Sequence, residues 1–452
     1  MSVPESRRDA PDSEPDWVGL DRLHVWHPYT QMLTAPPPLA VVSAQGAYIH
    51  TADGRRILDG ISSWWVNIHG HGHPRLRRAI EKQAAVLSQV VFAGSTHEPA
   101  ARLAAELSRR APGKLQWVFY SDDGSTAVEV ALKMACQLWK NRGDQGRDLF
   151  VALEHAYHGD TFGAMAAGGV RVFHQHFRGL LFEVRRARSA CCKPRGGDTG
   201  PDCGGQDAPG LEDILARDGR RVAAVIIEPM LQGAGGMIVW PAAFLRMVRD
   251  VTRAHGIPLI ADEVLTAFGR TGTLFACEHG PIEPDILCLS KALTGGSLPL
   301  AATLATDEIY RSFLGEEKDR ALLHGHSYTG NALACAAALE SLAILDDERS
   351  LERVARLERL FAGRLERIGR LPAVRAVRGI GAVAAVELRT GGPGGYLDTL
   401  GSRLHVELLA RGILLRPLGN VLYFMPPYAI TDQEAHGVFD AIEDVVKDIA
   451  IR

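Results

Sequence analysis

The sequence predicts an α/β protein with a large domain, in which helices flank a mostly parallel sheet, and a smaller α+β domain. Apolar runs at residues 222–227, 258–261 and 285–289 are typical of buried parallel strands, which are covered on both faces. These runs alternate with amphipathic helical patterns, as expected for βα units. With 452 residues, the chain can bury a large core and divide into more than one domain.

The charges of the chain are nearly balanced. Lys and Arg number 50 and Asp and Glu number 53, which gives a formal net charge of −3. Such a balance provides no electrostatic attraction to nucleic acid or an anionic membrane. No apolar run approaches the roughly 20 residues that span a bilayer, and the first sixteen residues lack the apolar core of a secretory signal. We therefore expect a cytoplasmic protein that binds neither nucleic acid nor membrane.

The seven cysteines form an odd, scattered set that is more typical of reduced thiols than of a disulfide framework. Cys191, Cys192 and Cys203 lie in a Gly- and Pro-rich loop. Because they lack a paired C-x-x-C spacing, we predict no metal site there.

The pattern of turns and apolar residues divides the chain into four parts. Residues 1–16 are rich in Pro, Ser, Asp and Glu, which predicts a disordered tail. Residues 17–70 contain two strands about an Asp-Gly turn and are expected to join the smaller domain. Residues 71–329 are expected to form the large domain and residues 330–452 the small C-terminal domain.

Within these parts, several elements follow from local patterns. Apolar periodicity predicts helices over residues 74–90, 98–109, 241–255 and 351–371, and residues 324–345 read as a polar turn and an apolar helix. Residues 115–121 read as a strand that turns sharply into a helix from about Ser125. Thr431 and Glu434 have the spacing of a capping box for the last helix.

Polar and aromatic residues at the ends of these elements are candidates for a site. Gly124 and Ser125 open a helix, where backbone N–H groups suit a phosphate, although Ser125 is equally compatible with a simple N-cap. Tyr157 could stack on a planar ligand or lie in an ordinary loop. In an extended backbone, one of the adjacent Trp64 and Trp65 must face away, so the pair is either one buried and one interfacial ring or part of a pocket wall.

Asp262 and Lys291 follow two neighbouring predicted strands, so both emerge where open α/β sheets bind ligands. An acid and a lysine in one crevice suit pyridoxal phosphate, because the amine forms a Schiff base and the carboxylate keeps the pyridine nitrogen protonated. The alternative is a structural ion pair at the strand ends.

The motifs now form an ordered set: the Gly124-Ser125 turn, YHGDT, IEP, DEV with GRTG, SKALTGG and HGHSYTGN. Together they resemble the class III aminotransferases, pyridoxal-phosphate enzymes of fold type I, over nearly the whole chain after the tail. The resemblance implies catalytic roles for Lys291, Asp262 and Tyr157. It also implies cofactor contacts from Tyr157 and Val264 on the ring faces, from Gly124 and Ser125 at the phosphate, and from Ser327 across a homodimer interface. Asp123 stands where the family usually has serine and brings a carboxylate near that phosphate.

Within this family the chain resembles the branch that converts 8-amino-7-oxononanoate to 7,8-diaminononanoate in biotin biosynthesis. Motifs such as WHPYTQ, SSWW and RPLGNVLYFMPPY carry this resemblance. It implies that Tyr29, Trp64, Tyr157 and Asp160 line the substrate pocket and that Arg416 binds the substrate carboxylate in a bidentate pair.

The amino donor is open between two readings. HGHSYTGN resembles enzymes that use lysine, whereas Tyr29 and Trp64 match those that use S-adenosylmethionine, which we favour. Two other functions compete: a class III transaminase for an ω-amino acid or a diamine, and a non-catalytic binding protein on the same fold.

Overall fold

A seven-stranded sheet forms the centre of the computed structural model, which describes residues 15–189, 209–391 and 395–451. The strand order is β4-β12-β11-β10-β7-β5-β6. The strands are β4 (Leu115–Ser121), β5 (Leu149–Leu153), β6 (Val184–Ala187), β7 (Val222–Ile227), β10 (Leu259–Asp262), β11 (Ile286–Leu289) and β12 (Ala301–Thr306). β12 alone runs antiparallel to the other strands of this sheet, so the predicted mostly parallel sheet is confirmed.

Helices cover both faces of this sheet. In β10, Ile260 packs into one core cluster whereas Leu259 and Ala261 pack into the other, as the two-residue period of a strand requires. One face is covered by α4 (Glu98–Arg110), α8 (Leu211–Asp218), α9 (Ala242–Ala254) and α11 (Ala332–Asp347), and the other by α5 (Gly124–Asn141), α6 (Phe162–Ala167) and α10 (Asp307–Ser312). Burial on both faces explains why the strands are continuously apolar.

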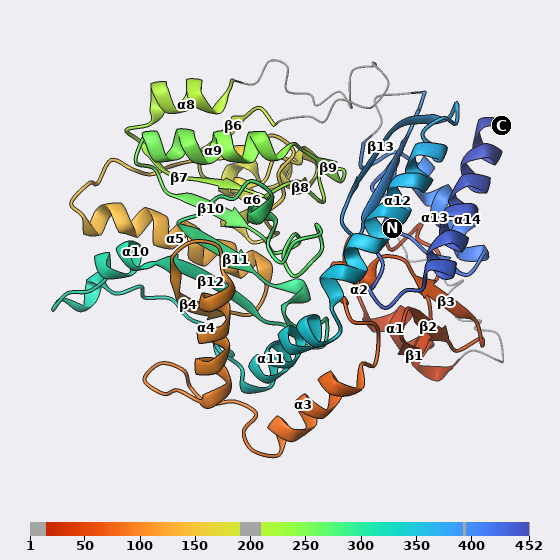
Figure 1. The fold of residues 1–452 in the computed structure, drawn as a ribbon, viewed down its shortest axis with the longest axis horizontal. Coiled ribbons are helices and arrows are strands. Elements are labelled where there is room, and N and C mark those ends of the chain that lie inside the picture. The colour runs from red at the N-terminus through yellow and green to blue at the C-terminus, as the bar shows by residue number, and fades with distance from the viewer. Residues whose placement is uncertain (1–14, 190–208, 392–394, 452) are drawn as a thin grey trace.

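Two smaller sheets lie on the opposite side of the molecule, as Figure 1 shows. One pairs β1 (Val41–Gln45), β2 (Tyr48–Thr51) and β3 (Arg56–Asp59) with β15 (Ile413–Leu414), and the other contains β13 (Val374–Ile380), β14 (Val383–Leu388) and β16 (Val421–Phe424). The neighbouring helices are α12 (Ser350–Ile368), α13 (Leu400–Ala410) and α14 (Asp432–Ile451). The pairing of β3 with β15 joins the N-terminal strands to the C-terminal part of the chain. The exact domain boundaries stay a prediction.

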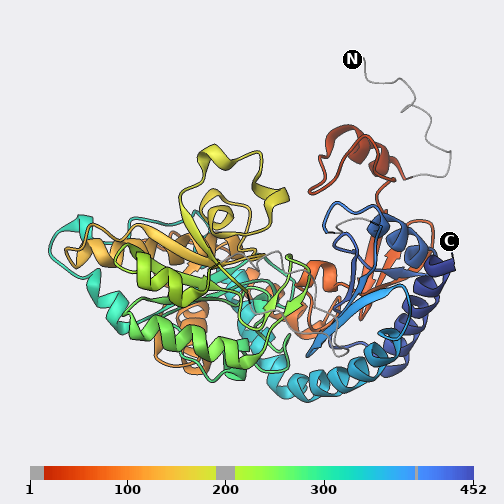
Figure 2. The same cartoon turned by 90° about the horizontal axis from the view of Figure 1, so that it is seen from above.

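The remaining elements are short or peripheral. They are α1 (Asp16–His24), α2 (Ser62–Trp65), α3 (Pro74–Ala84), α7 (Arg171–His174), the hairpin of β8 (Leu231–Gln232) and β9 (Ile238–Val239), and the 3-10 turns η2 (Arg178–Leu180), η3 (Ala276–His279), η4 (Lys291–Thr294) and η5 (Lys318–Arg320). The predicted capping box of the last helix is confirmed, since Glu434 N donates to Thr431 Oγ1 and Thr431 N donates to Glu434 Oε2. Figure 2 shows α1 and the segment after it rising above the rest of the molecule.

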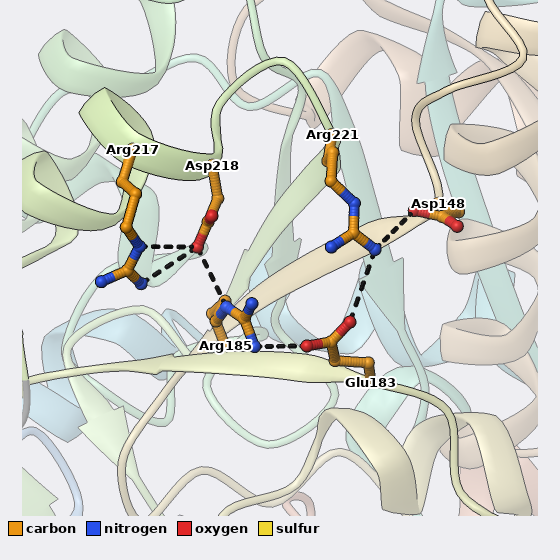
Figure 3. Close-up of polar contacts among 6 residues, drawn as sticks. All are labelled: Asp148, Glu183, Arg185, Arg217, Asp218 and Arg221. Atoms are coloured by element: carbon orange, nitrogen blue, oxygen red, sulfur yellow. Dashed lines mark hydrogen bonds and ion pairs between the residues drawn. The ribbon is translucent and has the colours of Figure 1, made fainter.

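Charged side chains tie the edge strand β6 to its surroundings (Figure 3). Arg185 on β6 pairs with Glu183 and with Asp218 at the end of α8. Arg221 continues the network to Glu183 and to Asp148, which precedes β5. Most of these groups are well exposed, so each pair contributes little alone, and their main effect is to cover a strand edge with charge.

Some predictions fall outside the described residues. These are most of the tail over residues 1–16 and the loop with Cys191, Cys192 and Cys203. Among the described residues, none of the helices is long and apolar enough to cross a membrane.

Candidate active site

Asp262 and Lys291 lie at the carboxyl ends of adjacent parallel strands. Asp262 is the last residue of β10, and Lys291 begins η4 two residues after β11 ends. Lys291 has a left-handed backbone with φ of 47°, a conformation that is uncommon outside glycine. This strained turn directs the chain away from the sheet at the residue predicted to be catalytic.

A cavity of about 750 Å³ lies at this edge of the sheet. Its wall includes most of the residues predicted for the site, namely Gly124, Ser125, Tyr157, Asp160, Asp262, Val264 and Lys291. They come from the ends of β4, β5, β10 and β11, which the fold brings together at one edge. The structure therefore places an amine, two carboxylates, hydroxyls and an aromatic ring around one volume.

The first turn of α5 forms one end of the cavity. Asp123, and not Ser125, is the N-cap, because Asp123 Oδ1 accepts a hydrogen bond from Thr126 N at 2.9 Å. The N-cap alternative for Ser125 is therefore wrong; its Oγ instead accepts from Thr161 N at 3.0 Å. A Cβ atom on Gly124 would lie 2.4 Å from Val264 Cγ1, so only glycine fits there.

Burial changes the proton affinity of two groups in the cavity wall. It lowers the pKa of Lys291 from its usual 10.5 to about 8, although the carboxylates of Asp262 and Glu228 act in the opposite direction. Burial also raises the pKa of Glu228 to about 7, with a further increase from Asp262. A lysine with this pKa keeps an appreciable neutral fraction near neutral pH, which a nucleophile and base needs.

Asp262 is held by two partners. His158 Nδ1 lies 2.7 Å from Asp262 Oδ2, and Val264 N donates to Asp262 Oδ1 at 3.1 Å. The His158 side chain is fully buried, and its Nε2 has no hydrogen-bond partner among the described residues. His158 was not among the predicted site residues, although its place beside Tyr157 in the YHGDT motif was an available signal.

The two tryptophans lie on a left-handed turn. Residues 62–65 have φ values of 49°, 57°, 95° and 74°, so the extended backbone considered for this pair is wrong. Ser62 Oγ donates to Met425 O at 2.8 Å and Ser63 N donates to Asp59 Oδ2 at 2.7 Å, which hold the strained turn. Trp65 is buried and lines the cavity, with Lys291 Nζ 4.7 Å from its ring centroid. Of the two tryptophans considered for a pocket wall, Trp65 lines this cavity, whereas the substrate pocket was assigned to Trp64.

Trp64, Tyr29 and Arg416 form a group beside the cavity. The Tyr29 and Trp64 ring centroids are 5.5 Å apart, and the Arg416 guanidinium lies 4.3 Å from the Trp64 ring. The Tyr29 hydroxyl donates to Asp160 and lies 3.3 Å from the Tyr157 hydroxyl, which links this group to the cavity wall. The described contact of the Arg416 guanidinium is with the Trp64 ring and not with a carboxylate, so its charge is available to a ligand.

Tyr29, Trp64 and Arg416 lie beside the cavity and not in its described wall, whereas Ser327 has no described contact with either group. Ser327 is exposed, in the turn before α11, and is absent from the described cavity wall. A single chain therefore gives it no contact with the site, and the contact predicted across a homodimer interface remains a prediction.

Comparison with known proteins agrees with this geometry. The family model for aminotransferase class-III matches residues 30–446. Adenosylmethionine-8-amino-7-oxononanoate aminotransferase of Synechococcus elongatus is 49% identical over 94% of this chain and 99% of its own length. The protein of the same name from Geobacter sulfurreducens is 42% identical over 96% of this chain and 97% of its own length.

Solved structures give the same result for the fold. A crystal structure of adenosylmethionine-8-amino-7-oxononanoate aminotransferase from Methanocaldococcus jannaschii has a TM-score of 0.89 and 38% identity, covering 96% of this chain and 98% of that one. An amine transaminase from an uncultivated Pseudomonas species, in a PLP-bound form, has a TM-score of 0.84 and 34% identity, covering 93% and 97%. The match of fold, site and sequence over nearly the whole length shows that this chain belongs to the class III aminotransferases.

Proposed function

We propose that this chain uses pyridoxal phosphate to transfer the amino group of S-adenosylmethionine to 8-amino-7-oxononanoate, which forms 7,8-diaminononanoate. The observation that carries the proposal is the meeting of Lys291 and Asp262 in one cavity whose edge holds Tyr29, Trp64 and Arg416. Relatives of that name, 49% and 42% identical, support it.

The residues of the cavity fit this cofactor. The amine of Lys291 suits the aldehyde, and the carboxylate of Asp262 suits the pyridine nitrogen, where its negative charge favours the protonated form. The N-terminus of the 18-residue helix α5, with Ser125 and the space that Gly124 leaves, suits the phosphate. When bound, pyridoxal phosphate acts as an electron sink for the substrate and carries the amino group between the two substrates.

The chain's own residues have distinct tasks in this proposal. Lys291 Nζ, with its pKa lowered to about 8, removes the proton from the donor α-carbon and returns it during the exchange. Asp262 keeps a fixed orientation because His158 and Val264 N hold both of its oxygens. Val264 and Tyr157 lie in the cavity wall as flat and apolar surfaces for the two ring faces.

The edge of the cavity suits a long apolar acid. Arg416 would bind the carboxylate of 8-amino-7-oxononanoate in a bidentate pair, and the rings of Tyr29 and Trp64 would contact its aliphatic body. The donor in this proposal is S-adenosylmethionine, as the names of the relatives indicate for those proteins. Lysine as the donor is the alternative, which the HGHSYTGN segment favours.

The proposal extends to assembly and location. A homodimer would bring Ser327 of a second copy to the phosphate end of the site. A cytoplasmic location fits the free thiols of the described cysteines Cys136, Cys277, Cys288 and Cys335.

The first experiment supplies purified protein and pyridoxal phosphate with 8-amino-7-oxononanoate and tests S-adenosylmethionine and lysine as separate donors. Product only with S-adenosylmethionine supports the proposal. Product only with lysine assigns the donor to the alternative, and no product with either moves the protein to the amine transaminases with other substrates.

Arg416→Ala tests how the keto acid is recognised. Loss of a charged bidentate contact should raise KM for 8-amino-7-oxononanoate on the order of 100-fold, with a smaller effect on the donor. Arg411→Ala is the matched control, because Arg411 pairs with Glu407 and Asp448 instead. Equal KM values in the two variants would count against recognition by Arg416.

A further inference from the structure

Phe173 on α7 lies at the centre of an aromatic cluster. It was not itself among the predicted site residues, although two of its neighbours were. Its ring centroid is 5.6 Å from that of Tyr29, 5.8 Å from that of Tyr157 and 4.9 Å from that of Tyr396. All three pairs are edge-to-face, a favourable arrangement for aromatic rings. The three tyrosines come from the N-terminal segment, the loop after β5 and the segment before α13, so Phe173 joins three distant parts of the chain.

The segment that carries Tyr29 is irregular and largely exposed. Residues 25–40 lie between α1 and β1 without a helix or strand, and Trp26 and Leu33 are 86% and 75% exposed. Tyr29 has a left-handed φ of 52°, which a tyrosine adopts only when its surroundings hold it. Figure 2 shows this segment and the region of α7 rising on the same side of the molecule.

The described polar and aromatic contacts of the Tyr29 side chain involve four residues, each of which can be substituted on its own. Besides Phe173, they are the ring of Trp64 and the hydroxyl contacts with Asp160 and Tyr157. Trp64, Asp160 and Tyr157 already belong to the site, whereas Phe173 is absent from the described cavity wall. Phe173 therefore reaches the site through its neighbours Tyr29 and Tyr157 and not by lining the cavity itself.

We propose that Phe173 is a positioning residue that holds Tyr29 over the edge of the cavity and so sets the affinity for both substrates. The inference rests on the proposed function for the identity of the substrates. Both substrates must pass the same edge, so loss of Phe173 affects the donor and the keto acid alike. This distinguishes it from Arg416, which recognises only the carboxylate of the keto acid.

Cofactor binding should be independent of Phe173. Tyr157, which Phe173 also contacts, keeps a support that involves neither Phe173 nor Tyr29, because its backbone N donates to Glu228 Oε1 at 2.9 Å. The visible absorbance of the bound cofactor should therefore stay the same when Phe173 is truncated.

The test compares Phe173→Ala with Phe177→Ala in the full-length holoenzyme. Phe177 is a matched control, because its ring packs on Phe162 at 6.1 Å and away from the three tyrosines. Phe173→Ala should raise KM for both substrates about tenfold with a smaller change in kcat, and Phe177→Ala should change neither. Phe173→Tyr, which keeps the ring, should restore the KM values.

Two further measurements separate this inference from the proposed function. Chymotrypsin should cleave the segment 25–40 faster in Phe173→Ala than in Phe177→Ala, a result that needs no substrate. In a Tyr29→Ala background, Phe173→Ala should add no further change in KM. The inference would be overturned if the two phenylalanine variants were cleaved at equal rates and had equal KM values. It would also be overturned if Phe173→Ala alone lost the cofactor absorbance. Both outcomes count even if the wild-type protein makes the expected product. If the wild-type protein forms no product but Phe173→Ala is still cleaved faster than Phe177→Ala, the role of Phe173 in placing Tyr29 is supported and the proposed substrates are wrong.

Discussion

At the scale of single residues, Glu228 shows how hydrogen bonds accommodate a buried carboxyl group beside the site. Glu228 is buried, and its two oxygens accept from Tyr157 N at 2.9 Å and Gly233 N at 3.0 Å. These bonds connect the loop that carries Tyr157 to the turn after β8. The raised pKa, about 7, shows that burial outweighs the two donors. Glu228 therefore positions two site loops and balances the charge near Lys291.

Glu228→Gln should destabilise the protein by about 1–3 kcal/mol, because an amide places N–H groups opposite a backbone N–H that needs an acceptor. The natural carboxyl group also makes stability depend on pH. Its folded pKa of about 7 lies above the usual 4.5, so the folded state binds more protons between these values and stability falls as pH rises through this range. Denaturant unfolding of the variant should lack this component. The control is Glu316→Gln at an exposed position, and equal unfolding curves for the two variants would contradict the assignment.

The lowered pKa of Lys291 has a measurable consequence for cofactor loading. Capture of the aldehyde needs the neutral amine, and a pKa of about 8 makes the neutral fraction rise about tenfold between pH 7 and 9. An ordinary lysine would show about a hundredfold rise over the same range. The rate at which the apoenzyme gains visible absorbance with pyridoxal phosphate should follow the smaller change, and Lys291→Ala should gain none of this band. A hundredfold dependence would show that burial does not lower the pKa.

At the scale of elements, the sequence could predict what local patterns determine. The strand over 115–121 matches β4, and the strands before Asp262 and Lys291 match β10 and β11 within one residue, because burial on both faces leaves a continuous apolar run. The helix predicted over 74–90 ends at Ala84, before Leu87, which would continue its apolar face. Apolar periodicity shows which side chains could be buried, but it does not show whether another element packs against them.

Other features of the site depend on contacts between distant residues and could not be predicted from local patterns. The left-handed turn at Trp64 and Trp65 is held by Met425, more than 350 positions away. Phe173 lies in no recognised motif, and its partners come from three separate segments. Nothing in the local sequence identifies either contact, because both exist only after the sheets have packed together.

The hairpin of β8 and β9 is joined to the three-stranded sheet by Arg378, which also forms a buried ion pair within that sheet. Arg378 on β13 donates to Glu387 Oε2 on β14 at 2.6 Å, and also to Met237 O at 3.0 Å and Gly236 O at 2.8 Å. Both charged side chains are only 6% exposed. Arg378 therefore links the part of the chain that follows Glu228 to the smaller sheet, and Glu387 balances its charge.

Glu387→Ala should destabilise the protein by about 3–5 kcal/mol, because it leaves the charge of Arg378 buried without its partner. The double variant Arg378→Met with Glu387→Met should lose less, since it removes both charges and keeps apolar volume. Urea unfolding of the three proteins measures both effects. A double variant that is less stable than Glu387→Ala would show that the pair itself, and not the unpaired charge, determines the loss.

At the scale of the whole molecule, one exposed apolar surface adjoins the predicted interface residue. Gln89 Nε2 donates to Ser327 O at 2.9 Å, so the segment with the exposed Val86 and Val91 contacts the segment with the exposed Leu323 and Tyr328. Exposed apolar side chains gathered in this way are typical of surfaces that bind another protein. Because Ser327 lies in the same surface, a second copy of the chain that covered it would receive Ser327 close to the contact.

Val91→Asp combined with Leu323→Asp should therefore convert the proposed homodimer to monomers, because the dimer contact would bury two charges among apolar side chains. Sedimentation equilibrium would measure the change in mass. If Ser327 of a second copy contributes to the phosphate site, the monomeric variant should also bind pyridoxal phosphate more weakly, and Ser327→Ala should weaken binding without changing the mass. Val406→Asp, an exposed position on α13, is the control that should change neither property. A monomeric variant with unchanged cofactor affinity would show that each chain completes its own site.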